Sequence, residues 1–201
     1  MKQIIIITVL LSISSLALGR IGMENFPPRS IDEASSQGSN ERTRQLRSII
    51  RDKELRKSDP DRVTSAIAQL GEMRSAESVD DLIELLTFRR SLHVGNADPN
   101  MIREIHPVAP SEQYPATEAL IQIGTPSLAA LVRVIETHEL GSVESENANF
   151  AVSMIFREDP EAGASYLRSA ASRSSNRQSI SRLQTAANRL GNLARKLKKS
   201  N

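Results

Sequence analysis

The chain has 201 residues, three His, no Cys and no Trp, and a formal net charge of +2. The lack of Cys excludes a disulfide framework, thiol catalysis and Cys-ligated zinc. Aromatic residues make up only 3% of the chain, so Leu, Ile and Ala supply most apolar positions, which is typical of closely packed helices. The length suits one domain or one short repeat array.

The first nineteen residues are predicted to be a signal peptide. Lys2 supplies a positive charge, Ile4–Ile13 is mostly apolar, and Ala17-Leu18-Gly19 places small residues where a signal peptidase cleaves. We therefore expect an exported protein, periplasmic or secreted, whose mature form begins at Arg20. The alternative is an uncleaved anchor, although about 15 apolar residues are fewer than the roughly 20 that span a bilayer. With no Cys after the small residues, a lipoprotein anchor is excluded.

Residues 20–40 are predicted to be a flexible linker, because they contain Pro27-Pro28 and a stretch rich in Ser and Gly but few apolar residues to bury. An amphipathic helix is expected from Glu41 to Lys57, with Asn40 as a possible N-cap. Its narrow apolar stripe consists of Leu46, Ile49 and Ile50. A mostly polar helix of this kind suits the capping position at the end of a repeat array.

The clearest pattern lies in Tyr114–Glu136, which is predicted to form two short amphipathic helices. The apolar residues recur at helical spacing, first as Ala116, Ala119, Leu120 and Ile123 and then as Leu128, Leu131, Val132 and Ile135. Between the two sets, Gly124 can adopt the positive φ that ends a helix, Thr125 can cap the next helix with its hydroxyl, and Pro126 fits the first helical position.

A second copy of this pattern covers Asp59–Leu86, with ten apolar or Gly positions of matching class, among them Gly71 opposite Gly124. Such a hairpin cannot bury its apolar faces alone and must stack on neighbours. The segment ALIQIGTPSLAALVRVI resembles a HEAT repeat of the bacterial, bilin-lyase-like type, and Pro60–Leu86 resembles it less closely. The resemblance implies helical hairpins stacked into a curved rod, which commonly binds other proteins, and it implies no activity.

A third, degenerate unit is expected after Gly141. Its first helix carries Ala148, Ala151, Val152 and Ile155, and Asp159-Pro160 repeats the start seen at Asp59-Pro60. The last helix is expected from about Ser179 to Lys198 and is predicted to cap the array, since about two heptads are too few to argue for a coiled coil. The predicted fold is therefore all-α, a short α-solenoid of HEAT-like hairpins over residues 41–201 with about seven or eight helices.

Between the two clear repeats lies an insertion at about residues 88–113, longer than the usual helix connection of about 2 to 8 residues. Insertions in solenoids map to one face, often the binding face. Arg89 and Arg90 on one side and the apolar Met101, Ile102 and Ile105 on the other suit a partner surface with a charged rim and an apolar centre. The insertion can equally be a decoration without a partner.

Charge is distributed unevenly along the chain. Residues 162–201 contain six Arg, three Lys and no acidic residue, so the whole-chain charge of +2 leaves −7 for the first 161 residues. The densest cations, Arg195, Lys196, Lys198 and Lys199, form a candidate anion-binding surface for anionic lipid or another envelope polymer. Export argues against nucleic acid. The alternative is a solvated helix face whose charge complements a helix C-terminus and nearby acidic helices.

The sequence carries few signs of chemistry. His93, His106 and Asp98 lie in the insertion, but their spacing is not that of a common metal motif. His138 is expected near a helix end, and Glu77, Asp80 and Asp81 in a first helical turn, where negative charge is favoured. We expect no catalytic residue and no cofactor.

Two functions remain open from the sequence. The first is an exported adaptor that binds another protein through its solenoid face and its insertion. The second is a metal-binding or enzymatic accessory that uses the residues of the insertion, namely His93, His106 and Asp98.

Overall fold

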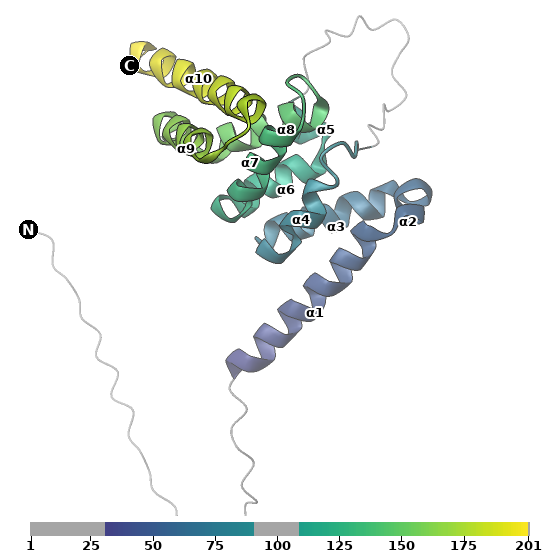
Figure 1. The fold of residues 1–201 in the computed structure, drawn as a ribbon. Coiled ribbons are helices and arrows are strands. Elements are labelled where there is room, and N and C mark those ends of the chain that lie inside the picture. The colour runs from purple at the N-terminus through teal and green to yellow at the C-terminus, as the bar shows by residue number, and fades with distance from the viewer. Residues whose placement is uncertain (1–30, 91–108, 201) are drawn as a thin grey trace, which may run out of the picture.

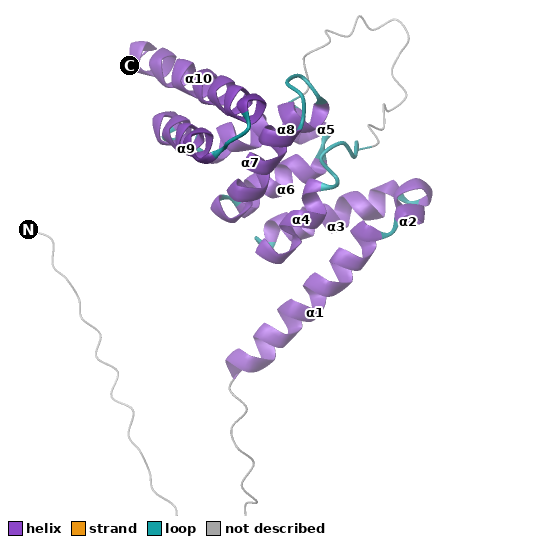
Figure 2. Cartoon of the chain, in the orientation of Figure 1, coloured by secondary structure: helices purple, strands orange, loops and turns teal. Residues whose placement is uncertain are grey.

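The computed structural model describes residues 31–90 and 109–200. Within these residues the chain forms helices and no strand (Figure 2). This confirms the predicted all-α class. The predicted signal peptide and most of the predicted insertion lie outside the described residues.

The described residues contain ten α-helices and two short 3-10 turns, Ala76–Ser78 and Thr125–Ser127. In chain order the α-helices are α1 (Ile31–Arg51), α2 (Lys53–Ser58), α3 (Pro60–Glu72), α4 (Val79–Ile83), α5 (Pro110–Gln113), α6 (Pro115–Ile123), α7 (Leu128–Thr137), α8 (Val143–Ile155), α9 (Pro160–Arg173) and α10 (Arg177–Ser200). The count exceeds the expected seven or eight because α1 and α2 are separate and because the end of the insertion forms α5.

Figure 1 shows the helices as a stack with α1 at one end and α9 and α10 at the other. Helices α1, α3, α6 and α8 pack successively against one another, α4 packs against α6 and α7, and α7 packs against α8. Helix α10 closes the stack against α7 and α9. The apolar stripes of the two predicted repeats, Asp59–Leu86 and Tyr114–Glu136, are buried as expected, including Ala66, Ile67, Leu70, Leu82, Leu86, Ala119, Leu120, Ile123, Leu131 and Ile135.

Helix α1 begins at Ile31, so the last ten residues of the predicted 20–40 linker are helical and that boundary is wrong. Pro28 is the last strong helix breaker in this part of the sequence, and a single Gly38 costs only about 1 kcal/mol. The helix ends at Arg51 because the Asp52 carboxylate accepts hydrogen bonds from the backbone N–H groups of Glu54 and Leu55, at 2.9 and 3.0 Å. This cap starts α2.

Two aspartates begin helices as the sequence predicted. The Asp59 carboxylate accepts a hydrogen bond from the backbone of Arg62 at 3.1 Å, and Asp159 accepts one from Ala162 at 3.0 Å. Each is followed by Pro at the first helical position, which needs no backbone donor. Helices α3 and α9 therefore begin in the same way, with an Asp cap followed by Pro.

The break between α6 and α7 is as predicted at Gly124 but not at Thr125. Gly124 has φ 78° and ends α6. Thr125, however, makes no side-chain cap and lies in a 3-10 turn. The Ser127 hydroxyl instead donates to the carbonyl oxygens of Leu120 and Gly124, at 3.0 and 2.7 Å, and so satisfies acceptors at the end of α6.

Gly71 does not end a helix, although it was matched to Gly124. It lies inside α3, and the positive φ of the following turn falls on Arg74. A Cβ atom at Gly71 would lie 2.8 Å from the Cα atom of Ala119 and 2.5 Å from Oε1 of Gln122. Gly71 therefore marks a close approach between α3 and α6.

Polar groups also join distant layers. Asn147 of α8 is 2% exposed, and its amide donates to the carbonyl oxygen of Leu86 at 2.6 Å. At the other end of the stack, Ser179 and Arg182 of α10 donate to the carbonyl oxygen of Glu136, at 3.1 and 2.7 Å. These bonds satisfy backbone carbonyls that no helix uses.

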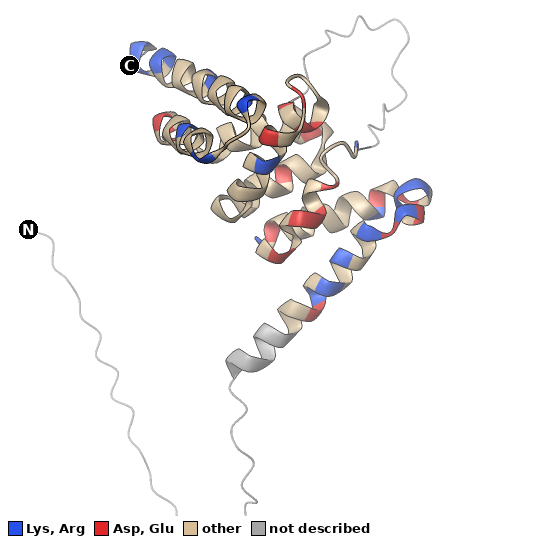
Figure 3. Ribbon diagram, viewed as in Figure 1, with Lys and Arg blue, Asp and Glu red and all other residues tan. Residues whose placement is uncertain are grey.

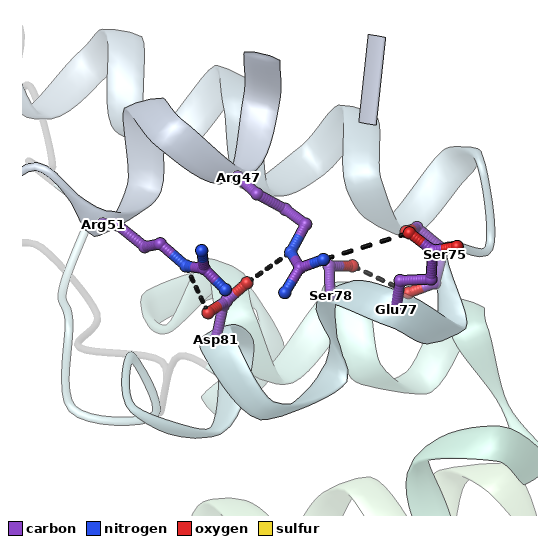
Figure 4. A network of polar contacts seen from close by, with 6 residues as sticks. All are labelled: Arg47, Arg51, Ser75, Glu77, Ser78 and Asp81. Atoms are coloured by element: carbon purple, nitrogen blue, oxygen red, sulfur yellow. Dashed lines mark hydrogen bonds and ion pairs between the residues drawn. The ribbon is translucent and has the colours of Figure 1, made fainter. Parts of the chain in front are cut away.

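A charged clamp holds α1 to α4 (Figure 4). The Asp81 carboxylate accepts hydrogen bonds from Nε of Arg47 at 2.6 Å and from Nε of Arg51 at 2.7 Å, and its side chain is only 11% exposed. Burial raises the pKa of Asp81, but the hydrogen bonds and charges of Arg51 and Arg47 outweigh this and hold the pKa below its ordinary value of 3.8. The folded state therefore favours the ionised carboxylate.

We predict that the clamp stabilises the protein at neutral pH and fails in acid. The pKa of Asp81 is lower in the folded than in the unfolded chain. The ionised carboxylate therefore contributes fully to stability at pH values above the ordinary pKa of 3.8, and this contribution is lost as the pH falls through the pKa of the folded state. Asp81→Asn should lower the free energy of unfolding near neutral pH by about 1–2 kcal/mol and flatten its decline in acid. Denaturant titrations over a pH series measure both effects.

The matched control is Asp80→Asn, because the Asp80 side chain is 83% exposed and pairs with the exposed Arg133 at 3.0 Å. It should change stability little and keep the decline in acid. Equal pH profiles for the two variants would contradict the clamp.

We also predict that Gly71→Ala destabilises the stack. Overpacking costs about 1–3 kcal/mol, and the higher helix propensity of Ala, worth about 1 kcal/mol, offsets only part of it. Gly38→Ala is the matched control, since Gly38 also lies in a helix but a Cβ atom there meets nothing within 4 Å. Thermal denaturation should show a lower midpoint for Gly71→Ala and an equal or higher one for Gly38→Ala.

Candidate functional site

A groove opens between α8 and α10 beside the short helix α5, with a volume of about 320 Å³. Its lining consists of Pro110, Glu146, Asn149, Phe150, Ser153, Ala186, Arg189, Leu190 and Leu193. The residues from α8 and α10 are spaced by three or four positions, so that each helix contributes one stripe. The groove therefore follows the two helices and is open to solvent along them.

The polar side chains that line the groove form hydrogen bonds and an ion pair with other groups of the protein. Asn149 donates to the carbonyl oxygen of Ser145 at 2.8 Å, and the Ser153 hydroxyl donates to that of Phe150 at 2.7 Å. Arg189 and Glu146 form an ion pair at 2.9 Å across the rim. The groups that remain for a ligand are mainly apolar.

The apolar part of the lining consists of Phe150, Ala186, Leu190 and Leu193, and Leu193 is 39% exposed. A surface of this kind fits apolar side chains of a partner better than a charged small molecule. A second hollow between α1 and α3 is larger, at about 600 Å³, but is lined mostly by polar side chains such as Arg42, Gln45 and Gln69.

The predicted insertion leaves and rejoins the helices at one place next to this groove. The backbone N–H of Arg90 donates to the carbonyl oxygen of Gln113 at 3.0 Å, which joins the two ends. Pro110, at the start of α5, lines the groove. The end of the insertion and the groove are thus neighbours.

Arg89 and Arg90, predicted to bind a partner, make contacts within the chain. The Arg89 guanidinium lies 5.5 Å from the centroid of the Tyr114 ring, and its Nε donates to the Tyr114 hydroxyl at 3.1 Å. Arg90 lies 3.9 Å from the carboxylate of Glu118. Both arginines therefore fix the base of the insertion.

The other predicted residues of the insertion, Met101, Ile102 and Ile105, lie outside the described residues. The same holds for His93, Asp98 and His106, on which the metal-binding alternative depends. Over residues 31–90 and 109–200, no group of three or more His, Asp or Glu side chains is arranged to hold a metal ion.

The acidic residues at the start of α4 link helices. Asp80 and Asp81 lie in the first turn, as predicted, and each also pairs with Arg from another helix. His138 ends α7, with Nδ1 at 3.1 Å from the carbonyl oxygen of Val134. Asp80, Asp81 and His138 therefore make contacts that join helices or end them.

The predicted anion-binding cations lie at the exposed end of α10. Arg195, Lys196, Lys198 and Lys199 are all exposed, and Arg195 donates to Asn192. Figure 3 shows that Lys and Arg are frequent on α1, on α2 and at this end of α10, whereas the layers between carry most of the acidic residues. Both ends of the stack are therefore more basic than its middle.

Sequence reasoning missed the groove between α8 and α10. The available signal was Leu193, which continues the stripe of Ala186 and Leu190 toward the exposed end of the helix. Phe150 gave no signal, because it lies beside the buried stripe of α8.

None of the described helices combines the length and the apolar composition that a membrane span requires. Taken together, Pro115–Ile123 and Thr125–Thr137 meet these two criteria, but the two segments are bent by 114° relative to each other.

Comparison with known proteins gives one finding. The family model described as the PBS lyase HEAT-like repeat matches residues 64–88, which cover most of α3 and all of α4. The match falls on the first of the two clear copies, the one with the weaker resemblance by sequence. Searches of curated proteins and of solved structures gave no significant match. This match supports a HEAT-like repeat over residues 64–88, and the stacked helices of the described residues are consistent with it.

Proposed function

We propose that this protein is an exported helical scaffold that binds an apolar segment of another exported protein and has no catalytic activity of its own. The binding face consists of the groove between α8 and α10 together with the insertion at residues 88–113. HEAT-like repeats are suited to this task, because a stack of hairpins presents an extended surface.

The observation that carries the proposal is the position of the apolar groove at the base of the insertion. Pro110 lines the groove and lies two residues after the last residue outside the described part of the chain. A connection this long has an entropic cost of about 1–2 kcal/mol for each residue it orders. Contact with a partner is one way to offset that cost.

The chemistry of the groove defines the partner. The Asn149 and Ser153 side chains are bonded to their own helix, so the groove offers a partner mainly the apolar surfaces of Phe150, Leu190 and Leu193. The ion pair between Arg189 and Glu146 provides a polar rim. The best fit is an apolar peptide segment flanked by polar residues.

Site-specific cross-linking tests the proposal. A photoreactive amino acid at Ser153, which lines the groove, should capture a discrete exported protein in the native host. The same probe at Leu140, which is 45% exposed and outside the groove lining, is the control. The proposal is wrong if the two positions give the same products.

The captured partner then allows a direct measurement. We predict that Leu193→Glu raises the Kd for the purified partner at least about tenfold, because it buries a charge against Phe150 and Leu190. Leu140→Glu, an equal change at an exposed Leu elsewhere, should leave the Kd unchanged. Circular dichroism checks that both variants fold.

A shortened chain tests the role of the insertion. We predict that replacing residues 91–108 with a short Gly/Ser link keeps the fold, because Arg90 and Gln113 hold the two ends together and shorter loops cost less to close. The variant should bind the captured partner more weakly. Unchanged affinity with an intact melting curve would confine the binding face to the groove.

Export is tested separately. We predict that the protein recovered from the envelope or the medium begins at Arg20, because Ala17 and Gly19 place small residues before that position. N-terminal sequencing decides the point. A membrane-bound form that retains Met1 would contradict cleavage and indicate an anchored protein.

A further inference from the structure

We propose that the C-terminal end of α10 is a docking surface for anionic lipid bilayers. This inference does not depend on the protein-binding groove, and either proposal can fail without the other. It rests on the charge, the exposure and the apolar stripe of one helix end.

The charge at this end is uniformly positive. Four of the five residues from Arg195 to Lys199 are cations, and residues 162–201 contain no acidic residue that would neutralise them locally. All four cations are exposed.

The apolar stripe of α10 extends beyond the part that is buried. Leu183, Leu190 and Leu197 are spaced by seven residues and therefore lie on one face of the helix, and they are 0%, 4% and 45% exposed, respectively. After Ala194, every residue through Lys199 is exposed. The same face that forms the core of the stack thus continues into solvent at its end.

The combination of these two features selects the partner. An acidic polymer would interact with the cations alone, whereas a lipid surface accepts both the cations, at its anionic headgroups, and the exposed Leu197, at the boundary with the acyl chains. We infer that the end of α10 lies along the headgroup layer while its first half stays packed on α7 and α9.

The test is sedimentation of the mature protein, in the form that N-terminal sequencing establishes, with vesicles. One set consists of phosphatidylcholine alone and the other contains about one third phosphatidylglycerol, which gives a negative surface potential. Binding to the second set only, weakening as salt screens the charges, is the expected result.

Changing Arg195, Lys196, Lys198 and Lys199 to Gln should lower the partition coefficient about fivefold for each cation removed. The matched control changes four exposed cations elsewhere, Arg44, Lys53, Lys57 and Arg62, to Gln, so that the net charge is equal in the two variants. The control should bind like the wild type. An equal loss in both variants would show an effect of net charge only and would overturn the proposal.

Leu197→Gln separates the apolar contribution from the charge. It should weaken binding by a similar factor at every salt concentration, because apolar burial is not screened. Binding that depends on the four cations but is unchanged in Leu197→Gln, or that is as strong for heparin as for the anionic vesicles, would indicate a general polyanion site and would contradict lipid docking.

Discussion

The close contact between α3 and α6 determines how the two clear repeats fit together. At Gly71 there is no room for a Cβ atom, because the backbone of Ala119 occupies the space. Small residues on both sides let the helix axes approach, and the larger side chains beside them, such as Ile67 and Leu120, are then fully buried. Each further layer is positioned on this pair, since α1 packs on α3 and α8 packs on α6. Most contacts in such a stack are between neighbouring layers, so a shift at this interface would displace the layers beyond it.

The features that the sequence predicted correctly each depend on the residues of a single helix. Periodicity located the helices and the buried face of each, and the Asp-Pro pairs at Asp59 and Asp159 marked two helix starts correctly. Gly124 likewise ended α6. These features follow from backbone geometry within a few residues, so a local pattern is sufficient to find them.

What the sequence did not predict depends on pairs of helices. Gly71 matched Gly124 by position, yet its role comes from Ala119, which lies in another helix. Asp81 was assigned to a helix N-terminus, and its pairing with Arg47 required knowledge of where α1 lies. The groove between α8 and α10 is of the same kind, because no single stripe predicts a space between two helices. The repeat pattern predicts that neighbours stack but not which side chains meet.

The bond between Arg90 and Gln113 has a consequence for how the chain can change over time. The two repeats are joined where the insertion leaves and returns, so the distance between its ends does not depend on the number of residues between them. The entropy of closing a loop rises slowly with length, by about 0.6 kcal/mol for each doubling. Sequence and length in this region can therefore vary at little cost to the helical stack. A different segment can be inserted there without rearranging the helices, and its C-terminal end would lie next to the groove beside Pro110.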